Sequence, residues 1–121
     1  MYKAGTVEEL SHFEALIDRD VYREALRIVT MLDDEYGPDR DIDNDDGGFV
    51  LIVENVQDIS DIGERYMKLD NRRHEAVDVV KCWNKPYINA FFLSNNEYGI
   101  NVFVPIDIAP AVLLADLSQG K

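Results

Sequence analysis

The sequence predicts a single α+β domain: a two-layer sandwich with a mostly antiparallel sheet of about four strands and helices packed on one face. Apolar residues recur at helical spacing in the first third of the chain and at strand spacing in the last third. The 121 residues, of which 46% are hydrophobic, suffice for one core, and no repeat or linker divides them. The predicted order of elements is ααβαβββα.

Two helices are predicted in the first 37 residues. The first covers residues 7–17, because Thr6 and Glu9 have the spacing of a capping box and apolar residues then recur every three or four positions. The second begins after an aspartate cap, either Asp18 or Asp20, and ends at Gly37, which a proline follows.

The middle of the chain is predicted to hold a strand and a third helix. Residues 49–53 are a short, continuous apolar run, which is typical of a strand buried on both faces. Residues 56–69 return to helical spacing, with Asn55 or Asp58 as the cap, and a polar connection follows up to His74. A crossover through this helix would place the strand parallel to the next one.

The last third is predicted to form an antiparallel meander and a short helix. The strands cover residues 77–83, 87–94 and 98–106; the closing helix covers 109–117 and ends in a frayed tail, 118–121. Pro105 cannot donate a hydrogen bond to a neighbouring strand, so the third strand is predicted to lie at an edge. Alternation then points Phe103 outward, where it would offer a surface for homodimerisation unless a second layer of helices or the C-terminal helix covers it.

The charge of the chain is distributed unevenly. Against 24 Asp and Glu stand 12 Lys and Arg, which gives a net charge of −12. Residues 1–70 hold 19 acids and 7 bases, whereas residues 71–121 hold 5 of each, so the whole excess lies in the first part. Binding to nucleic acid or to an anionic membrane depends on basic side chains, and the composition therefore argues against both. It favours a basic protein as the partner.

Eight of the acids fall between positions 33 and 46, where Arg40 is the one base. Like charges at this density repel one another, so residues 38–48 are predicted to form a solvated, flexible loop. We expect the basic partner to dock on the N-terminal helices and on the eight acids, which are Asp33, Asp34, Glu35, Asp39, Asp41, Asp43, Asp45 and Asp46. Closely spaced carboxylates also resemble the phosphates of a DNA strand, so imitation of a nucleic acid stays open as the form of this binding.

The same segment partly matches a calcium-binding loop. Such a loop has carboxylates at positions 1, 3, 5 and 12 and glycine at position 6. Counted from Asp43, Asp45 falls on position 3, Gly48 on position 6 and Glu54 on position 12, but position 5 is a glycine and a strand follows where a helix is required. Asp43, Asp45 and Glu54 are therefore an incomplete set of metal candidates, and calcium is the one cofactor left open.

No catalytic machinery is visible in the sequence. None of the patterns GxSxG, HExxH, GxGxxG and GxxxxGK[ST] occurs. Cys82 is predicted to be a buried, inert thiol, His12 a surface residue, and His74 part of a small basic patch in a loop. A single cysteine cannot form an internal disulfide, and no signal peptide or membrane-spanning run is visible, so a cytoplasmic protein is expected.

These observations favour a non-enzymatic interaction or inhibitory module. Two alternatives stay open. One is a small enzyme that depends on a divalent metal held by the acidic loop, and the other is a ligand-sensing accessory domain with a pocket between the sheet and the helices.

Overall fold

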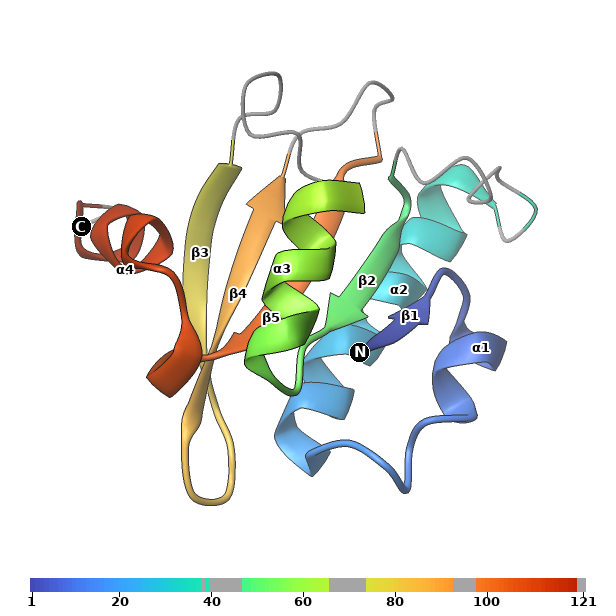
Figure 1. Cartoon of the computed structure of the whole chain (residues 1–121). Helices are drawn as coiled ribbons and strands as arrows, with labels where there is room; N and C mark the ends of the chain where they lie inside the picture. The colour runs from blue at the N-terminus through green and yellow to red at the C-terminus, as the bar shows by residue number, and fades with distance from the viewer. Residues whose placement is uncertain (38, 40–46, 66–73, 93–97, 120–121) are drawn as a thin grey trace.

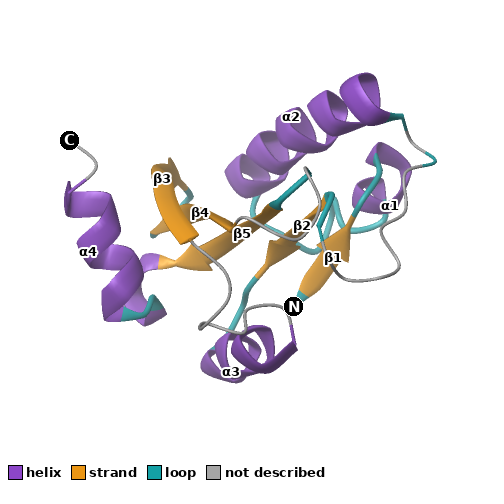
Figure 2. Cartoon of the chain, turned by 90° about the horizontal axis from the view of Figure 1, so that it is seen from above, coloured by secondary structure: helices purple, strands orange, loops and turns teal. Residues whose placement is uncertain are grey.

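The computed structural model describes residues 1–37, 39, 47–65, 74–92 and 98–119. Within them five strands form one sheet, with helices on both sides (Figures 1 and 2). The strands are β1 (Tyr2–Ala4), β2 (Phe49–Ile52), β3 (His74–Lys81), β4 (Pro86–Phe92) and β5 (Ile100–Pro105). The helices are α1 (Val7–Ser11), α2 (Arg19–Tyr36), α3 (Val56–Arg65) and α4 (Ala111–Gln119), with a single 3-10 turn, η1 (Ile106–Ile108), between β5 and α4.

The α+β class is confirmed, and the sheet is mostly antiparallel. Its order is β1-β2-β5-β4-β3, and the one parallel pair joins β2 to β5. The described sheet has five strands rather than about four, because residues 2–4 pair with β2 as β1. A three-residue strand is too short to show periodic alternation, which is why the sequence did not predict it.

The predicted meander of three strands, β3, β4 and β5, is confirmed. The predicted place of its third strand at an edge is wrong, because β5 lies at the centre of the sheet between β2 and β4. Pro105 is the last residue of β5 and lies beyond β2, whose pairing stops opposite Phe103. A central strand can end in proline when no neighbouring strand needs its N–H there.

The central position of β5 also overturns the predicted role of Phe103. Its side chain is 0% exposed and packs in the core beneath α2. Phe103 therefore offers no surface for homodimerisation.

The strand after α3 runs parallel to β2, as the crossover predicts. β5 is parallel to β2 and antiparallel to β4, and β3 is in turn antiparallel to β4. β2 and β3 are not neighbours, however, since β5 and β4 lie between them.

The sheet separates two apolar cores. Phe49, Leu51 and Val53 point to the side of α3 and α4, whereas Val50 and Ile52 point to the side of α2. Burial of this strand on both faces is thus confirmed. α1 and α2 form the layer of helices expected on one face, and α3 lies over the opposite face (Figure 2). Leu113 and Leu117 of α4 also pack against the core on the α3 side, so helices cover both faces rather than one.

Side-chain caps begin the helices as their sequences indicate. Thr6 accepts the backbone N–H of Glu9 at 3.1 Å, and the Glu9 carboxylate accepts the N–H of Gly5 at 2.8 Å. The helix they start, α1, ends at Ser11 instead of residue 17, and the chain continues in turns.

Both residues predicted as caps, Asn55 and Asp58, take part in reciprocal hydrogen bonds at the start of α3. The Asn55 side chain accepts the N–H of Asp58 at 3.0 Å, and the Asp58 carboxylate accepts the N–H groups of Glu54 and Asn55 at 2.9 and 3.3 Å. The predicted helix over 56–69 is described as far as Arg65, and residues 66–69 lie outside the described residues.

Candidate functional site

The last turn of α2 holds three acids, Asp33, Asp34 and Glu35, and no base. The carbonyl end of a helix carries the negative pole of its dipole, so carboxylates there are unfavourable. Asp33 has a structural explanation, because its Oδ2 accepts the N–H of Val7 at 3.2 Å and ties the start of α1 to the end of α2. Asp34 and Glu35 are exposed, and no hydrogen bond or ion pair within the described residues explains them.

The rest of the exposed face of α2 is balanced in charge. Arg19, Arg23 and Arg27 alternate there with Asp20 and Glu24. Arg27 donates to the Glu24 carboxylate, with 2.8 Å between Nε and Oε1. The unbalanced acids of the helix therefore lie at its C-terminal end.

We call this region the acidic end: Asp34, Glu35 and Tyr36 of α2, the exposed Asp39 beyond it, and Tyr98. The rings of Tyr36 and Tyr98 lie 4.7 Å apart in an edge-on arrangement, and Tyr36 is 37% exposed. Exposed carboxylates in the same helical turn as a tyrosine suit a protein surface that presents several guanidinium or ammonium groups, since these bind carboxylates by charge and aromatic rings by cation–π attraction. Four of the predicted partner-binding acids lie outside the described residues: Asp41, Asp43, Asp45 and Asp46.

The structure separates Glu54 from the end of the acidic loop. Five residues of extended chain lie between Gly48 and Glu54, so the two residues stand about 20 Å apart. The Glu54 carboxylate lies 4.0 Å from the amino group of Met1. Asp43 and Asp45 fall outside the described residues, and within those residues no group of three or more His, Cys, Asp or Glu side chains could hold a metal ion.

The N-terminal end of α2 is joined to the β3–β4 hairpin through Asp18. Its carboxylate accepts the N–H groups of Asp20 at 2.8 Å and of Trp83 at 3.3 Å. Partial burial alone raises the pKa of Asp18, but these hydrogen bonds and one from the Cys82 thiol outweigh it and hold that pKa below its ordinary value. Trp83, at the tip of the hairpin, is 88% exposed.

Cys82 follows β3 and is half-buried. Burial raises the pKa of the Cys82 thiol to about 12, and its hydrogen bond to the Asp18 carboxylate adds to the rise. The thiol is therefore protonated at neutral pH; Cys82 is half-buried where the sequence predicts a buried residue, and its inertness stays a prediction. His12 is exposed, as predicted, whereas His74 begins β3 instead of lying in a loop.

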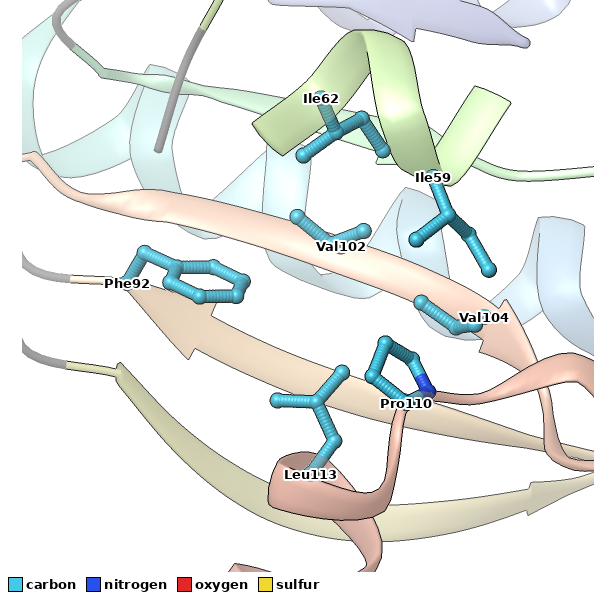
Figure 3. A pocket seen from close by; sticks show the side chains of 7 residues that line it. All are labelled: Ile59, Ile62, Phe92, Val102, Val104, Pro110 and Leu113. Carbon is cyan, nitrogen blue, oxygen red and sulfur yellow. The ribbon is translucent and has the colours of Figure 1, made fainter. Parts of the chain in front are cut away.

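One apolar pocket lies between the sheet and the helices of the α3 side (Figure 3). Its volume is about 20 Å³, and it is lined by Ile59, Ile62, Phe92, Val102, Val104, Pro110 and Leu113. This is room for about one water molecule, and a wholly apolar lining of this size stays dry. The pocket therefore offers no chemistry for a ligand.

Two buried polar residues were missed by the sequence reasoning. Asn89 of β4 is 4% exposed and Asn101 of β5 is 9% exposed. Each interrupts an apolar run, and this interruption of a central strand was the signal that could have identified them.

No helix in the described part of the chain combines the length and apolar character that crossing a membrane requires. Comparison with protein-family models, curated proteins and solved structures finds no match to this chain.

Proposed function

We propose that the protein is a non-enzymatic, acidic interaction module that binds a basic protein partner. Its docking surface is the acidic end together with the four acids that follow Asp39 in the sequence, which are Asp41, Asp43, Asp45 and Asp46. The observation that carries this proposal is the last turn of α2, where Asp34 and Glu35 stand at the unfavourable pole of the helix without a partner in the described structure.

Asp34 and Glu35 lower the stability of the fold. Each acid at the negative pole of a helix destabilises it by about 0.3–1 kcal/mol at low ionic strength. Residues that weaken the local structure without an internal contact are expected where function requires them. A Lys or Arg of a partner would relieve this repulsion on binding.

The expected partner carries exposed arginine or lysine side chains. The net charge of −12 attracts such a protein over a distance, and salt weakens the attraction. The exposed ring of Tyr36 next to Glu35 adds a contact that favours Arg over Lys, because a planar guanidinium also stacks on an aromatic face. A cytoplasmic location belongs to this proposal, since a single protonated thiol suits a reducing compartment.

The experiment uses a labelled, short oligoarginine peptide as the probe. At low salt the wild-type chain should bind it, and the affinity should fall as salt is added. The variant D34N/E35Q should bind about tenfold more weakly, since two exposed ion pairs contribute about 0.5–1 kcal/mol each. The control E14Q/D61N removes the same charge from other exposed acids and should change the affinity less.

Two results would contradict the proposal. One is no binding of the peptide at low salt, and the other is an equal effect of the control variant, which would show that only the overall charge matters. Competition by duplex DNA for a captured basic protein would identify imitation of a nucleic acid as the form of the binding.

A further inference from the structure

The outward face of α2 is not covered by any described element. Five side chains of the helix point into the core, and they are Val21, Ala25, Ile28, Val29 and Leu32. At 3.6 residues per turn the positions on the opposite side are 19, 23, 27, 30 and 34, and all of these residues are exposed. Figure 2 shows α2 as the outermost described element on its side of the sheet.

The N-terminal half of this face carries arginines. Arg27 donates to the Glu24 carboxylate. Arg19 and Arg23 are exposed, and their guanidinium groups make no hydrogen bond or ion pair with another described residue. The nearest acid in the sequence, Asp20, is half-buried. This half of the face therefore presents two guanidinium groups to solvent.

The C-terminal half carries the opposite charge. Asp34 lies on the same side of the helix, and Glu35 follows it at the negative pole. Thr30 and Met31 lie between the arginines and these acids and are uncharged. The outward face is therefore positive toward the start of α2 and negative at its end.

Such a face is complementary to itself when two copies of α2 lie antiparallel. With a two-fold axis between positions 28 and 29, Arg23 of each copy is opposite Asp34 of the other. Arg19 lies one turn earlier and so comes over the C-terminal end of the other helix, where Glu35 stands. Both contacts occur twice, and a two-fold contact of this kind closes at two copies.

We propose that the basic partner of the acidic end is a second copy of this chain, docked through α2. This inference rests on the proposed function, because Asp34 and Glu35 are the acids that it needs, and it adds Arg19 and Arg23 as the groups that meet them. In the dimer each arginine lies at the negative pole of the other helix, which relieves the repulsion between that pole and its acids.

The size and charge of the face set the strength of this dimer. The 18 residues of α2 span about 27 Å. One helix face of this length buries less than the ~1,200 Å² at which stable complexes begin, so the dimer is weak and reversible. Each copy carries a net charge of −12. At about 0.1 M salt, however, the Debye length is about 10 Å, which screens the distant charges and leaves the contacts at α2 effective.

The test is sedimentation equilibrium of the whole chain in about 0.1 M salt. Wild-type protein should pass from monomer to dimer at protein concentrations of ~0.1–1 mM, and about 1 M salt should return it to monomer. R19E/R23E and D34K/E35K should each stay monomeric over this range, since each places like charges opposite one another. The combined variant R19E/R23E/D34K/E35K exchanges the two halves, keeps the net charge at −12, and should dimerise again.

The matched control is E14K/D61K, which changes the net charge as D34K/E35K does but at exposed acids outside α2. It should dimerise at least as well as the wild type. The substitutions in α2 lie at exposed positions and the exchanged charges suit the poles of the helix, so these variants should fold.

A wild-type chain that stays monomeric up to about 1 mM, or a combined variant that does not recover, would overturn the proposal of a dimer. If that monomer still binds oligoarginine and D34N/E35Q weakens the binding, the proposed function stands and only the second copy is wrong. If it binds no peptide, both are wrong.

Discussion

Neutralising Asp34 and Glu35 is expected to stabilise the fold. Both are exposed, both lie in the last turn of α2, and neither makes a hydrogen bond or ion pair within the described structure. Removing two carboxylates from the negative pole of a helix should raise the free energy of unfolding by about 0.6–2 kcal/mol at low ionic strength. For a domain of this size that corresponds to a rise in Tm of roughly 2–8 °C.

The assay is urea unfolding of wild-type and D34N/E35Q protein at low salt and at high salt. The gain should shrink at high salt, because screening weakens the repulsion in the wild type. The neighbouring variant D33A is the control; it also removes a carboxylate from this pole, but it loses the acceptor of the Val7 N–H, worth about 1 kcal/mol, so it should show no net gain in stability. A loss of stability in D34N/E35Q would refute the reasoning, since it would show that these acids serve the fold.

Three further outcomes are expected from the structure. F92A should lower the free energy of unfolding by about 3–5 kcal/mol in urea titrations, because the ring is 2% exposed in a central strand; a loss below about 1 kcal/mol would contradict that packing. Alkylation of Cys82 by iodoacetamide at pH 8 should be at least tens of times slower than that of a free cysteine, and D18N should accelerate it. A rate like that of the free amino acid would contradict a raised pKa of Cys82. Burial alone raises the pKa of Asp58, but its hydrogen bonds hold that pKa below its ordinary value of 3.8. The charged Asp58 therefore stabilises the fold above pH 3.8, and this contribution is lost as the pH falls through the lowered pKa. D58N should therefore be less stable than wild type at pH 7 in urea, with the difference narrowing toward pH 3, and a constant difference would be inconsistent with the lowered pKa.

Local signals predicted the elements that depend on neighbours in the sequence. The start and end of α2 follow from Asp18, whose side chain accepts two N–H groups of the first turn, and from Gly37, whose φ of +86° suits glycine. The same holds for α3, where Asn55 and Asp58 cap each other. These features act within a few residues, so the sequence alone specifies them.

Contacts between distant segments were not predicted. The parallel pairing of β2 with β5 joins residues about fifty positions apart, and no local pattern encodes it. Pro105 was read as an edge signal, but its effect depends on where the neighbouring strand ends, which only the assembled sheet shows. The wrong edge position also led to the wrong prediction that Phe103 is exposed. Its side chain is buried because β5 is central.

The same division applies to the candidate sites. The sequence showed that the acids cluster, but it did not distinguish their roles. The Asp33 carboxylate accepts the N–H of Val7 in α1, whereas Asp34 and Glu35 make no hydrogen bond or ion pair in the described structure.

The most direct test of the central claim is to map the oligoarginine contacts on the protein by backbone amide resonances. We expect shifts at residues 33–37, 39, 47–48 and 98, which diminish as salt is added, and none at the hairpin around Trp83. Shifts spread evenly over the surface, or centred on that hairpin, would contradict the claim that the C-terminal end of α2 is where a basic partner docks.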